Sequence, residues 1–113
     1  MALDFYDRHG QPRLYSEDGE HLFDWAGNPV AYLKDGHIYG YNGAHLGWLH
    51  DGWLVNNSGH RLLFNDGATG GPMKPMKKLK PMKKLKKLKP LKSLRKLAPI
   101  KPSVSSHWDD FDW

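Results

Sequence analysis

Residues 1–67 repeat one pattern of apolar and turn-forming positions four times. Gly10, Gly27, Gly43 and Gly59 stand at nearly equal intervals along the chain. The positions five and four before each glycine are apolar or aromatic, and the position five after it is always aromatic. The apolar pairs are Phe5-Tyr6, Leu22-Phe23, Ile38-Tyr39 and Leu54-Val55, and the aromatic residues are Tyr15, Tyr32, Trp48 and Phe64. Such self-similarity indicates four copies of one structural unit that share a core.

Each copy predicts a β-hairpin. A short apolar run leads into a turn that ends in glycine, a second run follows, and an Asp-Gly pair leads to the next copy. Turns such as DRHG and NNSG suit a type I turn followed by a left-handed residue, which glycine adopts at low cost. Glycine interrupts the chain between Gly10 and Gly59 too often to leave room for a helix. Because one hairpin cannot bury its apolar face alone, we expect an all-β fold with four hairpins in a pseudo-fourfold arrangement.

The stretch LFDWAGNPVAYLKDGHIYGYNGAHLGWLHDGWLVNNSG carries this pattern, and it resembles the repeat of the bacterial 4-fold β-flower proteins. The resemblance covers roughly residues 2–67. It implies four hairpins around a central axis, and members are similar also in their Lys/Pro/Leu-rich C-terminal extensions. The family has no settled biochemical function, so the resemblance transfers no catalytic residues. A weaker likeness to choline-binding repeats, which use aromatic cages, directs attention to Trp25, Trp48 and Trp53.

Residues 68–102 follow a different period, of three. From Pro72 to Lys101 the chain divides into ten triplets: PMK, PMK, KLK, PMK, KLK, KLK, PLK, SLR, KLA and PIK. Met or an aliphatic residue fills every middle place, and Lys or Arg fills every third place except at Ala98. We predict two binding edges from this pattern. The cationic edge comprises Lys74, Lys77, Lys80, Lys83, Lys86, Lys89, Lys92 and Arg95, and the apolar edge comprises Met76, Leu79, Leu85, Leu88, Leu91 and Leu94.

The period of three favours an extended conformation over a helix. An α-helix has 3.6 residues per turn, so a strict period of three would wind the apolar row around it. Prolines at 72, 75, 81, 90, 99 and 102 also oppose a helix. Polyproline II has three residues per turn and aligns every third residue on one edge. The alternative is a disordered, solubilising arm, which would not need an apolar row in register.

Charge divides the chain into three segments. The formal charge is −5 over residues 1–67, +13 over residues 68–102 and −3 over residues 103–113. We therefore predict a hairpin domain over 1–67, a basic arm over 68–102 and an acidic aromatic tail over 103–113. The absence of cysteine excludes disulfides and thiolate chemistry. The N-terminal residues lack the apolar core of a signal peptide and no apolar run has transmembrane length, so we expect a cytoplasmic protein.

The tail SHWDDFDW is a candidate docking peptide, with Trp108, Phe111 and Trp113 as its anchors. Ser106 stands three residues before Asp109, a capping-box spacing that predicts one helical turn. Folding of the tail back onto the arm or the domain is the alternative. The seven histidines show no ligand spacing and no catalytic order, so the sequence predicts no metal, no cofactor and no catalytic residue.

These features predict a non-enzymatic binding module. Its amphipathic arm is expected to engage an anionic membrane surface or a protein partner, with its own acidic domain as a further surface. Nonspecific nucleic-acid binding would use the lysines but leave the apolar row unused, so it is disfavoured. The main alternative is a ligand-binding or catalytic β domain with an aromatic pocket around Trp25, Trp48 and Trp53, recruited by the arm.

Overall fold

The computed structural model describes residues 2–113, which form eight β-strands and no helix. The strands are β1 (Leu3–Tyr6), β2 (Pro12–Ser16), β3 (His21–Phe23), β4 (Pro29–Lys34), β5 (His37–Tyr39), β6 (His45–His50), β7 (Trp53–Asn56) and β8 (Arg61–Phe64). Each strand pairs antiparallel with its neighbours in the chain, and β1 also pairs with β8, so the sheet closes into a barrel. Within the described residues, no helix has the length and apolar character needed to cross a membrane.

Four equivalent hairpins build the barrel, namely β1–β2, β3–β4, β5–β6 and β7–β8. Each contains one irregularity of register, and it falls inside the apolar pair that precedes the turn glycine. The four turn glycines have φ between +78° and +88°, in the left-handed region. The Asp35-Gly36 and Asp51-Gly52 pairs both have positive φ, as type I′ turns require. The expected all-β fold of four hairpin repeats is confirmed.

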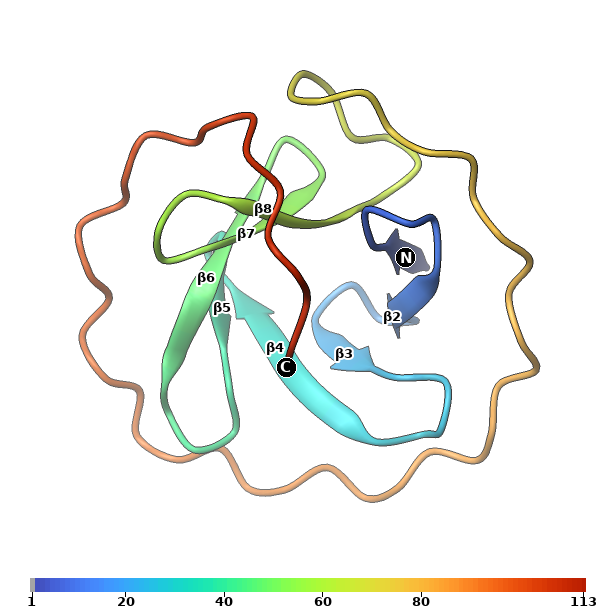
Figure 1. Cartoon of the computed structure of the whole chain (residues 1–113). Coiled ribbons are helices and arrows are strands. Elements are labelled where there is room, and N and C mark those ends of the chain that lie inside the picture. Colours follow the sequence, from blue (N-terminus) through green and yellow to red (C-terminus); the bar gives the residue numbers. More distant parts are fainter. Residues whose placement is uncertain (1) are drawn as a thin grey trace.

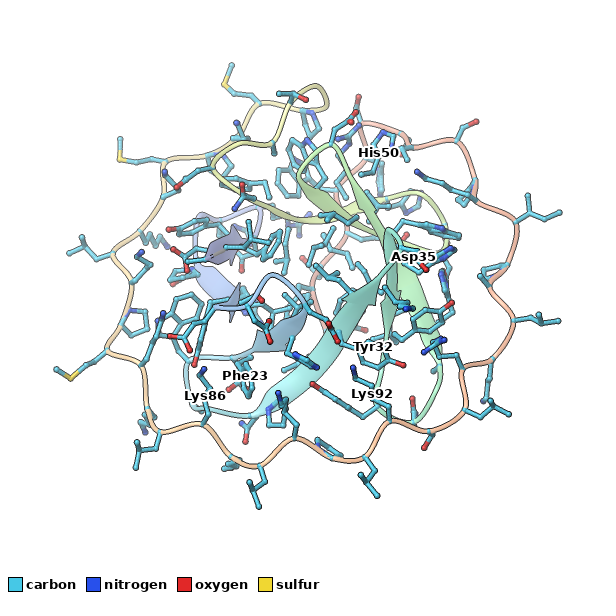
Figure 2. All side chains as sticks on the ribbon, turned by 180° about the vertical axis from the view of Figure 1, so that it is seen from behind. Phe23, Tyr32, Asp35, His50, Lys86 and Lys92 are labelled. Carbon is cyan, nitrogen blue, oxygen red and sulfur yellow. The ribbon has the colours of Figure 1, made fainter. Side chains whose placement is uncertain are left out.

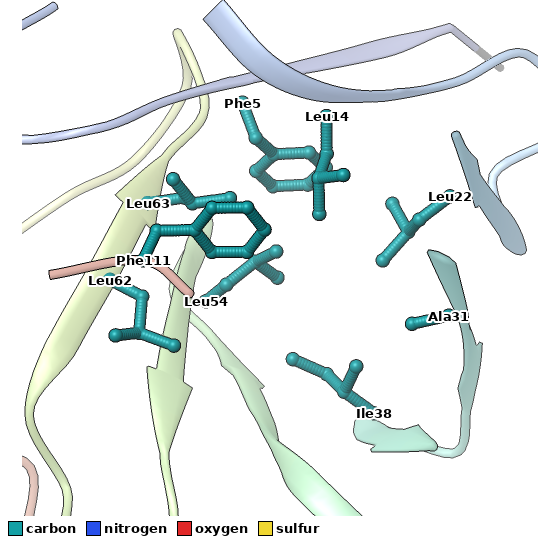
Figure 3. Close-up of a cluster of buried hydrophobic side chains, with 9 residues drawn as sticks. All are labelled: Phe5, Leu14, Leu22, Ala31, Ile38, Leu54, Leu62, Leu63 and Phe111. Atoms are coloured by element: carbon teal, nitrogen blue, oxygen red, sulfur yellow. The ribbon is translucent and has the colours of Figure 1, made fainter. Parts of the chain in front are cut away.

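The two members of each apolar pair take part in different clusters. The first members lie in the interior cluster, where they meet aliphatic residues from β2, β4 and β8 (Figure 3). This cluster contains Phe5, Leu14, Leu22, Ala31, Ile38, Leu54, Leu62, Leu63 and Phe111. The second members pack with the other aromatic residues of the repeats in three separate clusters. The barrel therefore has a mainly aliphatic interior, which also holds Phe5 and Phe111, and an aromatic outer wall.

The arm encircles this barrel. Residues 72–102 contain no strand or helix, and the chain over them runs around the four hairpins as an outer ring (Figure 1). The molecule is disc-shaped, with principal extents of 37 × 36 × 23 Å. Beyond the ring the chain turns inward, crosses the barrel and ends near its centre (Figure 1).

Candidate functional site: the encircling arm

Backbone hydrogen bonds attach the arm and the first residues of the tail to the barrel at intervals of nine residues. The N–H groups of Lys78, Lys87, Lys96 and Ser105 donate to the carbonyls of Gly10, Gly27, Gly43 and Gly59, with N–O distances of 2.8–3.0 Å. Lys84 and Ser93, also nine residues apart, donate to the carbonyls of Trp25 and Tyr41. Nine residues of arm thus span one hairpin repeat of the barrel.

This interval explains the placing of the prolines. In the triplets from 72 to 105, each first place holds either a proline or a residue whose N–H donates to the barrel. The prolines are at 72, 75, 81, 90, 99 and 102, and the donors are at 78, 84, 87, 93, 96 and 105. Proline has no N–H, and its ring restricts the backbone angle φ. Proline therefore stands only at first places outside the series of donors, so each proline stiffens the arm without the loss of one of these hydrogen bonds.

The length of the arm matches the perimeter of the disc. At about 3.1 Å per residue, residues 72–105 in polyproline II reach about 105 Å. A disc 36–37 Å across has a circumference of about 115 Å. Three triplets for each interval between neighbouring hairpins are therefore enough for an extended chain to run around most of the disc.

All four turn glycines also leave room for the encircling chain. A Cβ atom at Gly10, Gly27, Gly43 or Gly59 would overlap a carbonyl oxygen of that chain. The oxygens belong to Met76, Leu85, Leu94 and Ser103, again nine residues apart. These glycines thus serve the hairpin turn and the close approach of the arm at the same time.

The third-place cations face the barrel and cover its aromatic wall. Figure 2 shows Lys86 beside Phe23 and Lys92 beside Tyr32. The cations lie 4.3–5.7 Å from the ring centroids in five pairs: Lys77 over Tyr6, Lys83 over Tyr15, Lys86 over Phe23, Lys92 over Tyr32 and Arg95 over Tyr39. Where the fourth repeat has Val55 in place of an aromatic residue, the arm has Val104 in place of a cation, and both belong to one apolar cluster. A cation of the encircling chain thus lies against each of these aromatic rings, and a valine takes the place of the cation where the wall has a valine.

Carboxylates of the barrel pair with the same row of cations. Lys80 lies 2.8 Å from Asp4, and Lys92 lies 2.8 Å from Glu20. The hydrogen bond from Lys80 to Asp4 raises the pKa of Lys80, and the hydrogen bond from Lys92 lowers the pKa of Glu20. Further pairs join Lys77 to Asp66 and join Lys83 and Lys86 to Glu17. Each of these pairs is exposed to solvent and weak on its own, so the pairs hold the arm only as a set.

The remaining members of the predicted cationic edge also lie on the barrel side. Lys74 donates to the carbonyl of Ala68 at 2.7 Å. Lys89 lines a hollow of about 350 Å³ between the arm and the β2–β3 turn, together with Phe23. Of the surfaces that the sequence left open for these cations, the structure places them against the molecule's own barrel.

The middle-place residues form the opposite, outward face of the arm. Every one of them is 90–97% exposed, and a row of side chains projects from the rim of the disc (Figure 2). The row contains Met73, Met76, Leu79, Met82, Leu85, Leu88, Leu91, Leu94, Leu97 and Ile100. We call it the apolar rim. The predicted apolar edge, Met76, Leu79, Leu85, Leu88, Leu91 and Leu94, lies wholly within it.

The tail covers the barrel. Trp108 packs against Trp53 and Phe64, with ring centroids 5.4 and 6.2 Å apart. Phe111 joins the interior cluster, and Trp113 packs against that cluster while it remains half-buried. The expected helical turn is wrong, because residues 107–109 pair with β8 as an extended segment instead.

Arg61 on β8 holds the two ends of the ring together. Its guanidinium lies 4.7 Å from the centroid of Trp53 and donates from Nε to the carbonyl of Ser105 at 2.8 Å. A Cβ at Gly71, where the arm begins, would overlap this guanidinium. Burial lowers the pKa of Arg61. No sequence pattern pointed to this role, because the partners of Arg61 are brought together only when the ring closes.

Trp25, Trp48 and Trp53 are all buried in the outer wall. Trp25 packs with Tyr15 and Phe23, whereas Trp48 and Trp53 belong to the cluster around Phe64. Neither the hollow beside Lys89 nor a second one beside Pro90 and Trp113 is lined by any of the three. All three rings are therefore packed within the wall and line neither hollow.

Comparison with known families covers nearly the whole chain. Residues 3–113 match the family model described as 4-fold beta flower protein. The match includes the arm and the tail as well as the barrel. No curated protein and no solved structure matches the chain.

Proposed function

Because the chain belongs to the 4-fold β-flower family, whose name describes a fold and no activity, we propose a function from the geometry of the arm. The protein is a non-enzymatic module that binds an anionic membrane surface through its apolar rim and the lysines beside it.

The exposed rim is the observation that supports this function. Ten large apolar side chains with 90–97% exposure recur at every third residue along the arm. Full burial of one such side chain is worth about 1.5–3 kcal/mol, and contiguous exposed apolar surface marks interaction sites. The barrel does not supply this burial, because it contacts the arm through the backbone and the third-place cations.

Cations remain available beside the rim. Lys78, Lys84 and Lys96 stand at first places, and among residues 2–113 their side chains have no hydrogen-bond or ion-pair partner. A lysine close to an anionic leaflet contributes about 1 kcal/mol. The rim thus combines apolar side chains with unpaired positive charge, as interfacial membrane-binding segments do.

The shape of the rim favours lipid over a protein groove. The side chains of the row point outward from the edge of a disc, so the row is narrow and convex (Figure 2). A protein partner would need pockets matched to a clustered set of anchors. A fluid bilayer interface adapts to any sector of the rim, so the disc would bind on its edge through a few neighbouring triplets.

Vesicle co-sedimentation of the full chain tests the proposal. We expect binding to vesicles of mixed phosphatidylglycerol and phosphatidylcholine, and weaker binding to phosphatidylcholine alone. Serine at all ten rim positions should weaken binding at least tenfold, and Leu85→Ser, Leu88→Ser and Leu91→Ser together should weaken it less, because other sectors remain. The rim contacts no other part of the protein, so thermal unfolding should be nearly unchanged.

The lysines provide the matched control. Lys78→Gln, Lys84→Gln and Lys96→Gln should reduce binding to anionic vesicles and leave binding to neutral vesicles unchanged. Full binding by the ten-serine variant would overturn the proposal. Failure of the parent chain to bind either kind of vesicle would overturn it as well, and would direct the search to a protein partner.

A further inference from the structure

Three side chains with metal-binding atoms meet where the tail joins the barrel. His60 lies in the turn before β8, and His107 and Asp109 lie in the tail. One ligand atom from each lies within 4.8 Å of those of the other two. The Nδ1 atom of His60 is 2.8 Å from Oδ2 of Asp109, and Nε2 of His107 is 3.7 Å from Oδ1 of the same carboxylate.

The backbone fixes this arrangement. The N–H of Arg61 donates to the carbonyl of His107 at 2.8 Å, and the N–H of Asp109 donates to the carbonyl of Arg61 at 2.9 Å. These bonds form a parallel bridge between Arg61 and Trp108. Because side chains alternate along extended chains, the residues next to the bridge project to the side opposite Arg61 and Trp108. His60, His107 and Asp109 therefore share one face.

Hydrogen bonds orient the carboxylate of Asp109 before any ligand arrives. Asp109 accepts a hydrogen bond from Nδ2 of Asn56 at 2.8 Å on the oxygen that faces His60. Such an outer hydrogen bond on a ligating carboxylate is a usual feature of metal sites.

We propose that His60, His107 and Asp109 form a binding site for a divalent transition-metal ion such as Zn²⁺, with water in the remaining positions. Two imidazoles and a carboxylate are a usual ligand set for zinc, at distances of about 2.0–2.2 Å. The ion takes the place of the proton between His60 and Asp109. His107 is exposed and has the freedom to turn inward by the small distance that is needed.

The site would act as a clasp. Asp109 stands two residues before Phe111, which enters the interior cluster, and His60 stands next to Arg61, which holds the ends of the ring. An ion shared by His60 and the tail therefore ties the cover of the barrel to the hairpin beneath it. Metal binding and closure of the tail become one equilibrium.

Calorimetric titration of the full chain with Zn²⁺ tests this site. We expect one strong equivalent per chain at pH 7.5, and His107→Ala should weaken it at least tenfold. His107 is exposed and outside the core, so this variant should fold. His9→Ala removes another exposed histidine and should leave the affinity unchanged.

Amide exchange supplies a second readout. Zn²⁺ should slow exchange of residues 107–113 in the parent chain, an added chelator should reverse the effect, and His107→Ala should abolish it. Zinc binding that survives both His107→Ala and Asp109→Asn would overturn the proposal, as would binding without any change in tail exchange. A titration that shows no binding would overturn it too. Vesicle binding does not enter these measurements, so this site stands or fails separately from the membrane function.

Discussion

The barrel and the arm share fourfold repetition but use apolar residues in opposite ways. In the barrel, the first residue of each apolar pair is fully buried at Phe5, Leu22, Ile38 and Leu54. In the arm, the repeated Met and Leu residues face solvent, and the cations face the protein. A regular apolar period therefore does not by itself mean burial. The aromatic and acidic outer wall selects the cationic edge, and the apolar edge remains outside.

The two regions also differ in what holds them. Continuous antiparallel pairing and aliphatic packing stabilise the barrel. The arm is held by isolated backbone bonds, exposed ion pairs and cation–π contacts. The conformation of the arm depends on its hydrogen bonds to the barrel, whereas the barrel hairpins are stabilised by pairing and packing with one another.

The largest expected effect is a difference in stability between alanine variants of a buried barrel leucine and an exposed arm leucine. Leu54→Ala removes a fully buried side chain and should cost about 2–5 kcal/mol of unfolding free energy. Leu88→Ala removes a side chain that is 95% exposed and should stay within about 0.5 kcal/mol of the parent. Urea unfolding followed by tryptophan fluorescence measures both. Similar losses from the two variants would mean that the rim is buried in solution.

A smaller effect should distinguish two glycines that share a backbone conformation. Gly27 and Gly36 have φ of +88° and +80°, so alanine at either costs about 1–2 kcal/mol in strain. Only at Gly27 does the new Cβ meet the arm, whereas nothing lies within 4 Å of a Cβ at Gly36. Gly27→Ala should therefore be the more destabilising, and it alone should accelerate amide exchange at Lys87. Equal exchange at Lys87 in the two variants would refute the contact.

Two proline substitutions should test whether the backbone hydrogen bonds to the barrel set the nine-residue register of the arm. Lys87→Pro removes the N–H that donates to Gly27, which should cost about 0.5–1.5 kcal/mol. Leu88→Pro places the same ring where no hydrogen bond to the barrel is formed, so it should cost less. Thermal unfolding and exchange at Ser93 and Lys96 report the difference. Equal losses of stability from the two variants would contradict a nine-residue register set by these hydrogen bonds.

The smallest effect concerns two carboxylates of the β2–β3 turn region. Burial opposes ionisation of Asp18, but hydrogen bonds from His21, Glu20 and Ser16 lower its pKa well below 3.8. Its folded-state pKa lies below its unfolded value, so its stabilising effect is present above that value and is lost as pH falls. The stability difference between the parent and Asp18→Asn should narrow from about pH 5 to pH 2 in denaturant titrations.

High salt should distinguish the ion pair between this turn and the arm from the local hydrogen bonds within the turn. Glu20 owes its lowered pKa first to Lys92, and both side chains are exposed. About 1 M salt should therefore remove the effect of Glu20→Gln, because the Debye length falls to about 3 Å. The local hydrogen bonds of Asp18 should keep most of their effect. A salt response of the same size at both residues would contradict this division.

Much of the fold could be predicted from local patterns. Turn glycines, Asp-Gly pairs and alternating apolar residues predict hairpins because each feature acts within a few residues. The helical turn predicted at Ser106–Asp109 was wrong because a long-range contact decides the conformation there. A capping-box spacing is a weak local preference, and the pairing of residues 107–109 with Arg61 outweighs it.

The candidate sites were less accessible to sequence reasoning. The apolar rim was visible as a period, but its outward direction depends on the barrel wall. The nine-residue unit was present in the spacing of proline and Lys or Ser at first places, a signal that sequence reasoning did not use. His60 and His107 lie far apart in the chain, so their meeting followed from no spacing rule.

The sequence alone determined the four hairpins, the period of the arm and the opposite charges of the segments, because these follow from short-range backbone preferences and from composition. The tertiary structure decided which edge of the arm faces the barrel, where the tail enters and which histidines meet. Those outcomes depend on matching surfaces formed by residues far apart in the chain, and such surfaces exist only once the barrel has closed.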